Sequence, residues 1–415
     1  MALLIVDPLS SAQYLSDAFR ELGIETIVLY TANEFDTPEQ WRGVSDVFDE
    51  QVHVNSRHLE DLLQAIGDRP IDFVLNGREA SLALSDQLAT ALTPDYANDP
   101  ATSDTRMDKF RMTEAVAAAG LPHIRQWTLS AGDQDPSALD LASITWPAFI
   151  RPRRGVGSLG AAMLASQEDL RAYLSHPDVA ALAGLRSDVS EDDGKEFILS
   201  EFVEGTEYFV DTFSLQGKHY FSSIQRDRKD FINGHPMMRC HEVETDEGIV
   251  SRIATYVEGV LTAIGLNSGL AHTEVFLTRE GDPLLIEVNT RVSGAHGISN
   301  VCATLEGLNS QPALVKALVY DHVQDLPYSV PDKPRARVLC LFHFAKSPLP
   351  DLASLLHDDP AVKLVVPMRE PGYVHVDPPT SLADAVAVVL CHAEDPHALE
   401  ATSDRILAQD LRGWA

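Results

Sequence analysis

Apolar and helical patterns alternate over the first part of the chain. A continuous apolar run at 2–6 precedes a helical pattern that starts at Ser10 and ends at Gly23, and a second apolar run occupies 26–30. Strand, helix and strand in this order predict a parallel sheet that is buried on both faces. Three more elements continue the alternation: a helix at 59–66, a strand at 71–75 and a helix at 81–92. These patterns predict a small doubly wound α/β domain at residues 1–95.

Polar residues stand directly after two strands of this predicted domain. They are Asp7, Pro8 and Ser10 after the first strand, and Asn76, Gly77, Arg78 and Glu79 after the strand at 71–75. Ligands of doubly wound sheets bind beyond the carboxyl ends of the strands, so both groups are candidate ligand contacts. Two interpretations of Glu79 stay open: a substrate contact, or a carboxylate stabilised at the amino end of the next helix. The absence of a G-x-G-x-x-G motif argues against a dinucleotide site.

A basic, glycine-rich segment follows the next strand. A helical pattern at 104–119 carries Lys109, and a strand predicted at 147–150 leads into a loop at 151–160. The anion-binding candidates in this loop are Arg151, Gly155, Gly157 and Ser158. Glycines let backbone N–H groups approach an anion closely and arginines add positive charge, so the loop suits a polyphosphate. A purely structural turn is the alternative interpretation.

The middle of the chain mixes short strands with polar segments. An alanine-rich run followed by an acidic stretch at 178–196 predicts an exposed insertion. We expect strands at 197–199, 208–213 and 219–224, loops at 226–230 and 236–242, and a helix at 246–264 that is closed by Gly265. The second loop carries Met237, Met238, Arg239 and His241, which either pack or line a side-chain pocket, and we favour packing.

A β-hairpin is predicted between His272 and Asn289. Apolar runs at 273–277 and 283–288 flank a polar break that contains Gly281, as in two antiparallel strands joined by a tight turn. If Glu280 and Gly281 are the two loop residues, counting back along the ladder sets Glu274 directly opposite Glu287.

This hairpin is a candidate metal site. Directly opposed carboxylates lie roughly 4.5–5.5 Å apart at Cβ and repel each other unless a cation lies between them. Asn289 follows Glu287 by two positions and therefore shares its face, which gives the set of oxygen donors that Mg²⁺ prefers. Arg291, two positions further on, is expected on the same face, where it could bind a phosphate or carboxylate in bidentate geometry. A surface hairpin with scattered charges is the alternative.

The last part of the chain predicts a small α+β lobe. We expect a helix at 305–319, a linker at 332–334, strands at 337–344, 363–367 and 373–376, and a helix at 381–392. With the α/β domain at 1–95, these patterns divide the chain into a central domain at 96–310 and a C-terminal lobe at 311–415.

Composition and charge narrow the class of protein. The 415 residues are enough for two to four domains, and a formal net charge of −30 argues against a nucleic-acid partner. Cys240, Cys302, Cys340 and Cys391 lack C-x-x-C spacing, so neither a zinc site nor a disulfide framework is indicated. Because no secretion signal or membrane-length apolar run is present, we expect a cytoplasmic protein that does not bind membranes.

Taken in order, the motifs resemble the ATP-grasp superfamily. Lys109 on a helix, Arg151-Pro152 with its glycine-rich loop, the segment EFVEGTE at 201–207 and the E-strand-turn-strand-ExNxR hairpin keep the family's order. The predicted outer domains fit its flanking domains. The segments IVDPLSSAQYLSDAF, AHTEVFL and EVNTRVSGAHG are most similar to those of bacterial L-amino-acid ligases, which make dipeptides.

The resemblance implies an ATP site between two α+β lobes. Glu201 and Val203 would offer backbone groups to adenine, and Glu207 would bind the ribose. Lys109 and Arg151 would contact the phosphates, and the loop at 153–160 would close over the γ-phosphate. Family members usually carry lysine at the position of Arg151, and arginine keeps the charge while changing the detailed contacts.

The resemblance also implies the metal and substrate contacts. Glu274, Glu287 and Asn289 would hold two Mg²⁺ ions, for which Mn²⁺ could substitute. The expected catalytic residues are Arg291 and Arg151. The expected substrate contacts are Glu79, His272, Arg291 and Gly294, with simple packing as the alternative for His272.

These parts predict an ATP-dependent carboxylate-amine ligase. The γ-phosphoryl group of ATP would pass to an amino-acid carboxylate, and the amine of a second amino acid would attack the resulting acyl phosphate. The expected partners are small-molecule amino acids, and a homodimer is a candidate assembly. A biotin-carboxylase-like subunit, a non-catalytic ATP-binding module and a structural or interaction protein stay open as alternatives. The complete set of Glu274, Glu287, Asn289 and Arg291 argues against the non-catalytic module.

Overall fold

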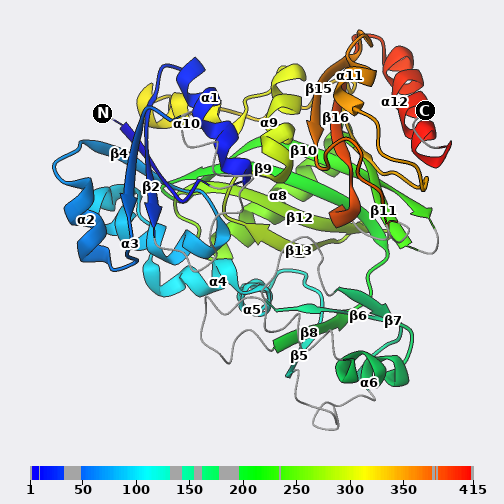
Figure 1. Cartoon of the computed structure of the whole chain (residues 1–415). Helices are drawn as coiled ribbons and strands as arrows, with labels where there is room; N and C mark the ends of the chain where they lie inside the picture. The colour runs from blue at the N-terminus through cyan, green and yellow to red at the C-terminus, as the bar shows by residue number, and fades with distance from the viewer. Residues whose placement is uncertain are drawn as a thin grey trace.

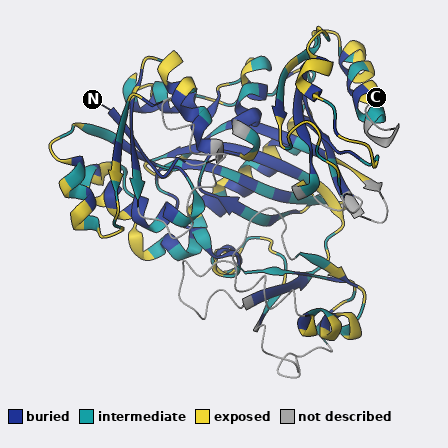
Figure 2. Ribbon diagram, in the orientation of Figure 1, coloured by how far each residue is buried: buried dark blue, intermediate teal, exposed yellow. Residues whose placement is uncertain are grey.

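The computed structural model describes residues 2–8, 10–31, 48–130, 143–153, 161–176, 196–232, 235–375, 379 and 382–412. In this part of the chain the strands form two four-stranded sheets and one eight-stranded sheet. The eight-stranded sheet runs through the middle of the molecule, with the N-terminal sheet at one side and the second small sheet below it (Figure 1). Strands of the central sheet are buried along most of their length, whereas the outlying helices expose one face (Figure 2).

The N-terminal domain is the predicted doubly wound α/β unit. Its parallel strands are β1 Ala2–Val6, β2 Glu25–Thr31, β3 Glu50–Val54 and β4 Ile71–Asn76, in the order β3-β2-β1-β4. Its helices are η1 Ser10–Gln13, α1 Tyr14–Glu21, α2 Leu59–Ile66 and α3 Leu82–Leu92. Helix α1 packs on one face of the sheet, and helices α2 and α3 pack on the other. Strand β3 is the one element of this sheet that the sequence analysis did not predict.

The second small sheet is antiparallel and carries the residues around Arg151. Its strands are β5 Gln126–Ser130, β6 Ala148–Pro152, β7 Ala162–Leu164 and β8 Glu196–Glu201, with helix α6 Gln167–Ser175 packed against them. The chain leaves this sheet after β8 and enters the central sheet at Gly205, so the segment at 202–204 connects the two lobes.

The helix predicted at 104–119 is two helices. Helix α4 spans Ser103–Met107 and helix α5 spans Lys109–Ala118, with Asp108 between them in an extended conformation. The Asp108 carboxylate accepts hydrogen bonds from the backbone N–H groups of Phe110 and Arg111, at 2.9 and 3.2 Å. Such an N-cap ends one helix and starts the next, and it makes Lys109 the first residue of α5.

The central sheet combines the predicted hairpin with strands from the C-terminal region. Its strands are β9 Gly205–Leu215, β10 Lys218–Ile232, β11 His235–Val243, β12 Gly269–Thr278, β13 Pro283–Asn289, β14 Ala336–Leu341, β15 Val362–Pro367 and β16 Ala387–His392, in the order β13-β12-β9-β10-β11-β14-β16-β15. Helix α8 Glu247–Ala263 covers one face, and helix α9 Gly294–Leu305 packs on the other. The C-terminal strands therefore extend the central sheet, while the domain division at 310 stays a prediction.

Two segments predicted as loops are strands. Residues 226–230 belong to β10 and residues 236–242 belong to β11, and these strands pair with Asp227 opposite His241. Arg226 contacts Glu242 at 2.9 Å, and Glu242 also binds Arg337 at 2.6 Å. Charged residues occur on both faces of these strands because ion pairs satisfy them, and this hides the alternation that identifies a strand in sequence.

The C-terminal region holds three further corrections. Residues 387–392 of the predicted helix 381–392 form β16, because a continuous apolar run does not distinguish a buried strand from a helix. The strand predicted at 373–376 is absent over the described residues 373–375. The helix predicted at 305–319 is interrupted after α9, where Gly307 has φ +77°, and restarts as α10 Gln311–Val315. Other elements of this region are a π-helical turn at Lys316–Tyr320, α11 Leu352–Leu356, a 3₁₀ turn at Leu382–Asp384 and α12 Pro396–Arg412.

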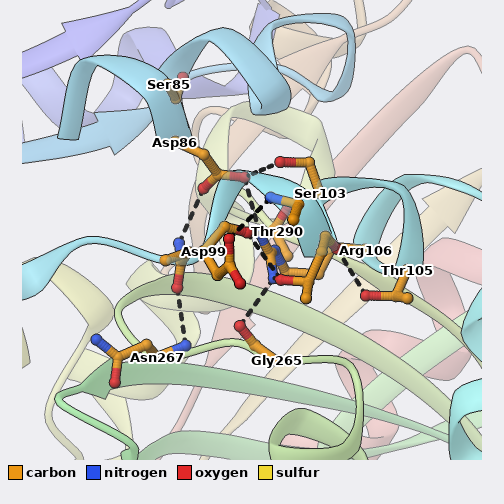
Figure 3. Close-up of polar contacts among 12 residues, drawn as sticks. Ser85, Asp86, Asp99, Ser103, Thr105, Arg106, Gly265, Asn267 and Thr290 are labelled. Atoms are coloured by element: carbon orange, nitrogen blue, oxygen red, sulfur yellow. Dashed lines mark hydrogen bonds and ion pairs between the residues drawn. The ribbon is translucent and has the colours of Figure 1, made fainter. Parts of the chain in front are cut away.

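A buried ion pair joins the N-terminal domain to the centre of the molecule (Figure 3). The Arg106 guanidinium lies 2.8 Å from the Asp86 carboxylate and donates to the carbonyl of Gly265 at 2.8 Å. Both side chains are almost completely buried, and Asp86 also accepts from Asn98 and Ser103. Residues from α3, α4 and the end of α8 are thereby fixed relative to one another.

None of the helices in the described ranges is long and apolar enough to cross a membrane.

Candidate active site

The predicted pairing of Glu274 with Glu287 is confirmed, but the predicted turn is wrong. Gly281 donates to the carbonyl of Thr278, and Thr278 donates to that of Asp282, both at 3.0 Å, so the loop is one residue longer than expected. A register shift compensates: Val275 pairs with Leu285, whereas Glu274 pairs with Glu287, which leaves Ile286 as an extra residue in β13. The bulge restores the pairing that a two-residue turn would have given.

The bulge is also used for a contact between the lobes. Arg151 in β6 donates to the carbonyl of Ile286 at 2.9 Å, and its other terminal nitrogen lies 3.6 Å from the Glu287 carboxylate. Because a bulged residue is left out of the strand ladder, its carbonyl is free for a partner from another element. Arg151 is therefore held against the hairpin by two groups.

Glu287 is the centre of a cluster of cations. Lys109, at the start of α5, lies 2.9 Å from its carboxylate, and Asn289 donates to it at 3.0 Å. Burial raises the pKa of Glu287, but Lys109 and Arg151 outweigh this effect and lower it below its ordinary range. Three elements that are distant in sequence thus converge on one ionised carboxylate.

Glu274 lies in the opposite electrostatic situation. Burial raises its pKa, and the neighbouring carboxylates Glu287 and Glu207 raise it further. The predicted repulsion between the opposed glutamates is therefore present. It raises the pKa of Glu274 and not that of Glu287, because Lys109 and Arg151 lie at Glu287.

His272 lies two residues before Glu274 on β12 and therefore on the same face of the sheet. Its Nδ1 is 2.7 Å from Asp211, which is directly opposite on β9, and its Nε2 is 3.7 Å from Glu274. Its ring stacks on Phe209 with a centroid distance of 5.6 Å. Burial lowers the pKa of His272, but Asp211 outweighs it and the net direction is upward. The predicted substrate contact is thus part of a hydrogen-bonded pair that the sequence analysis missed.

Lys229 is a second residue that the sequence analysis missed. It forms an ion pair with Glu207 and lies 3.8 Å from Asp227. Burial lowers the pKa of Lys229, but Glu207, Asp227 and the nearby Glu274 raise it overall. Recognising β10 as a strand would have placed Asp227 and Lys229 on one face by their spacing of two.

Arg291 does not continue the face of β13 as predicted. The strand ends at Asn289, and the Arg291 N–H donates to the Asn289 carbonyl at 2.8 Å, which turns the chain. The guanidinium donates to the Val292 carbonyl at 2.9 Å and remains close enough to His272 to oppose its protonation. Gly294 follows as the first residue of α9, after Ser293, whose buried hydroxyl has no hydrogen-bond partner in the described structure.

Other predicted site residues lie at the edge of this cluster or beyond it. Glu201 ends β8, where its carboxylate binds Arg125, and Val203 lies in the connection between the lobes.

Glu79 begins a 3₁₀ turn after β4, and within the described chain no hydrogen bond or ion pair joins it to the cluster. The nearby Asn76 does reach the centre, donating to the Thr290 carbonyl at 3.1 Å. Gly155, Gly157 and Ser158 lie outside the described residues.

The predicted metal ligands fit a site that is completed by a substrate. Among the described residues no three His, Cys, Asp or Glu side chains are grouped to hold a metal ion. Glu274, Glu287 and Asn289 supply two carboxylates and one amide, and burial together with the neighbouring carboxylates Glu287 and Glu207 raises the pKa of Glu274. Mg²⁺ takes few protein ligands and fills its shell with water and phosphate oxygens, which suits this donor set.

Comparison with known proteins agrees with this geometry. Residues 144–300 match the ATP-grasp domain. This part of the chain is an ATP-grasp domain. Over its whole length the molecule has the ATP-grasp fold: the crystal structure of L-amino acid ligase from Bacillus licheniformis superposes with a TM-score of 0.75, covering 99% of this chain and 97% of that chain at 17% identity.

Two curated relatives are similar to this chain over more than half of its length. Dapdiamide A synthase of Enterobacter agglomerans is 27% identical over 308 residues, which cover 70% of this chain and 67% of the relative. Alanine–anticapsin ligase of Bacillus subtilis (strain 168) is 23% identical over 249 residues, which cover 56% of this chain and 50% of the relative. The chain is thus similar to one enzyme that is named a synthase and to one that is named a ligase.

Proposed function

We propose that this protein is an ATP-dependent ligase that forms an amide bond between two amino acids. The carboxylate of one amino acid receives the γ-phosphoryl group of ATP, and the resulting acyl phosphate is attacked by the amine of the second. Phosphate leaves with the pair of electrons of its bond to the acyl carbon, and the products are a dipeptide or related amide, ADP and phosphate. The similarity to dapdiamide A synthase and to L-amino acid ligase supports this choice of substrates.

The observation that carries the proposal is the meeting of cations and carboxylates at the hairpin. Lys109 and Arg151 come from different elements and both reach Glu287, opposite Glu274. A phosphoryl transfer depends mainly on groups that position and neutralise phosphate oxygens, and this site concentrates them where two lobes meet. No nucleophilic side chain is needed, because the substrate carboxylate itself attacks the phosphorus.

ATP would occupy the space between the lobes. Lys109 and Arg151 would bind its phosphates together with Gly155, Gly157 and Ser158. The backbone at Glu201 and Val203 would meet adenine, and Glu207 would meet the ribose. Lys229 is added to this set because it bridges Glu207 and the neighbourhood of Glu274.

Glu274, Glu287 and Asn289 would hold Mg²⁺. The proposal includes two ions, for which Mn²⁺ could substitute. The metal supplies positive charge to the phosphate oxygens during transfer. A metal ion at Glu287 would share that carboxylate with Lys109 and Arg151, whose positive charges would then also face the phosphate oxygens.

The amino-acid substrates would lie next to the turn that follows β13. Arg291 would bridge the phosphate and the carboxylate being activated, and His272, Gly294 and Glu79 would contact the substrates. The free hydroxyl of Ser293 at the start of α9 favours an anionic group there, since helix N-termini present unpaired N–H groups. A homodimer remains part of the proposal for its assembly.

The test uses the full-length protein with ATP, Mg²⁺ and pairs of amino acids. Phosphate release and the mass of the product are measured for each pair. We expect at least one pair to release phosphate well above the rate with ATP alone and to give a product of dipeptide mass. If no pair does so, the dipeptide-ligase proposal fails, and bicarbonate-dependent release of ADP would favour the carboxylase-like alternative.

A further inference from the structure

The turn that carries Arg291 is bound by a residue of the N-terminal domain. Asn76 is the last residue of β4, and its Nδ2 donates to the carbonyl oxygen of Thr290 at 3.1 Å. The two residues are 214 positions apart in the chain. The end of a strand in one domain thus contacts the backbone of the turn that follows Asn289, a proposed metal ligand.

The peptide unit between Thr290 and Arg291 has both of its polar groups bound. Its N–H group, on Arg291, donates to the carbonyl of Asn289 at 2.8 Å, and its C=O group, on Thr290, accepts from Asn76. The first contact lies within the turn, whereas the second comes from another domain. Because a peptide unit is planar, contacts at both groups fix its orientation and with it the position of the Arg291 Cα atom.

The amide of Asn76 is itself held in one orientation. Its Oδ1 lies 3.2 Å from the hydroxyl of Ser85 in α3. A flipped amide would place Oδ1 against the Thr290 carbonyl, so that two acceptors would face each other. The backbone is also fixed here, because a Cβ atom on Gly77 would lie 2.5 Å from the carbonyl oxygen of Val6. The donor to Thr290 therefore comes from a rigid part of the N-terminal domain.

This hydrogen bond joins the two segments that carry proposed substrate contacts. Glu79 follows Asn76 by three residues, and Arg291 directly follows Thr290. A reacting group that is displaced by about 1 Å can cost roughly a hundredfold in rate, even when the change lies far from the chemistry. A single contact at the Arg291 turn is therefore sufficient to influence turnover.

We infer that Asn76 is a positioning residue for Arg291. It holds the peptide unit between Thr290 and Arg291 so that the guanidinium can bind the phosphate and the carboxylate that is activated. The role of Arg291 in this inference rests on the proposed ligase function, whereas the orientation of the peptide unit does not.

The test uses variants that keep the size of the side chain. Asn76 borders a cavity of about 20 Å³, which is large enough for one water molecule, so a smaller side chain would admit more solvent. Asn76→Asp keeps the shape and an acceptor near Ser85 but replaces the donor to Thr290 by a second acceptor. Asn76→Leu removes both polar groups and shows whether the loss of the donor is sufficient without an added charge.

Asn267→Asp is the matched control. The side chain of Asn267 donates to the carbonyl of Ala97 at 2.9 Å, so the same substitution removes the same type of contact at the same domain joint (Figure 3). No hydrogen bond in the described structure joins this side chain to the turn at Thr290. Urea unfolding shows whether the variants at the two positions lose similar stability.

The first measurement is hydrogen exchange of the Arg291 amide, which needs no substrate. Mass spectrometry of overlapping peptides isolates this position. We expect exchange in Asn76→Asp and Asn76→Leu to be roughly tenfold faster than in the wild type, because the turn opens more easily without its second contact. Asn267→Asp should exchange at the wild-type rate there.

The second measurement is amino-acid-dependent phosphate release in a double-mutant cycle with Arg291→Lys. We expect Asn76→Asp and Asn76→Leu to lower kcat by roughly 10- to 100-fold, with a nearly unchanged Kd for ATP. In the Arg291→Lys background the same substitutions should lower kcat by less than about threefold, because the side chain that Asn76 positions is already changed. Asn267→Asp should leave kcat unchanged in both backgrounds.

The outcomes separate positioning from general stability. Equal losses of kcat in the two backgrounds overturn the inference, since Asn76 would then act independently of Arg291. Unchanged exchange at Arg291 in the Asn76 variants overturns it, and so does an equal effect of Asn267→Asp, because the whole joint would then be responsible. If the wild type shows no amino-acid-dependent phosphate release, the proposed function fails, and hydrogen exchange still decides whether Asn76 holds the turn.

Discussion

Glu274 and Glu287 face each other across one hairpin, yet their surroundings give them different roles in stability. Glu287 neutralises Lys109 and Arg151, whereas Glu274 lies among carboxylates. In a metal-free protein, replacement of Glu274 therefore removes repulsion, and replacement of Glu287 removes the carboxylate that Lys109 and Arg151 both face. The same residue type therefore has opposite effects on the free energy of unfolding at these two positions.

The first prediction concerns this asymmetry. Without metal, Glu274→Gln should raise the free energy of unfolding, while Glu287→Gln should lower it by about 2 kcal/mol. The folded state binds a proton at Glu274 more tightly than the unfolded state does, so this group destabilises the wild type as pH rises above the ordinary glutamate range. The difference between Glu274→Gln and the wild type should therefore grow with pH in urea unfolding experiments.

Both variants should lose turnover by orders of magnitude if these residues hold Mg²⁺. Near wild-type turnover at saturating Mg²⁺ in either variant contradicts the metal assignment. Equal changes in stability for both variants contradict the asymmetry and leave the metal assignment untouched.

The second prediction concerns Arg291. Its guanidinium can bind one oxygen of the phosphate and one of the substrate carboxylate, whereas lysine offers a single point charge. Arg291→Lys should lose about 3 kcal/mol of transition-state stabilisation, or roughly a hundredfold in kcat, with a smaller change in ATP binding. Arg279→Lys is the control, since Arg279 is exposed at the hairpin turn and pairs with Glu204. Similar turnover in the two variants would remove Arg291 from the proposed catalytic set.

At this scale the sequence predicts residues with local motifs better than residues with distant partners. The hairpin motif placed Glu274, Glu287 and Asn289 together correctly, although the predicted turn is one residue too short and the bulge at Ile286 compensates for it. Asp211 and Lys229 were missed because their importance comes from neighbouring strands. An aspartate inside an apolar strand was the available signal for Asp211, since such a residue needs a buried partner.

At the scale of elements, prediction succeeded for the hairpin and for the α/β units, where short apolar runs alternate with helical patterns or turn residues. It failed for two strands of the central sheet. Strand β10 carries Arg226 and Arg228 on one face and Asp227 and Lys229 on the other, so its sequence looks like a polar loop. Strand β16 is apolar on both faces, and its sequence fits a buried helix equally well, because only its position inside the sheet distinguishes the two.

The third prediction concerns the start of β9, where the chain passes from one lobe to the other. A Cβ atom on Gly205 would lie 2.6 Å from the carbonyl oxygen of Leu277 in β12. Because that atom belongs to the backbone, the strands must separate, and Gly205→Ala should lower the free energy of unfolding by about 1–3 kcal/mol. Urea unfolding measures the change.

Gly259→Ala in α8 provides a matched control. A Cβ atom there would meet only the side chain of Leu121, at 3.1 Å, which can move, and alanine favours a helix over glycine by about 1 kcal/mol. This variant should be as stable as the wild type or more stable. If the two variants lose equal stability, close approach of β9 and β12 is not the cause.

At the scale of the whole molecule, the site depends on three units that are joined by few polar contacts. Arg151 joins the small sheet to β13, and Asn76 joins the N-terminal domain to Thr290, next to Arg291. The buried pair of Arg106 and Asp86 fixes the N-terminal domain on the other side of the same joint. None of these three contacts leaves a short sequence motif. The domains could therefore be predicted from their own patterns, whereas the contacts between them could not.

The last prediction tests this joint with a double-mutant cycle. Arg106→Met leaves the buried Asp86 carboxylate without its cation, and Asp86→Leu leaves the guanidinium unpaired, so each single variant should lose about 3–5 kcal/mol in urea unfolding. The double variant should lose less than the sum, by about 1–3 kcal/mol, because neither charge is then buried alone. The recovery should be incomplete, since Asn98 and Ser103 lose the acceptor that Asp86 gives them. Strictly additive losses would mean that the two residues stabilise their own elements independently, and that their ion pair does not hold the N-terminal domain to the central sheet.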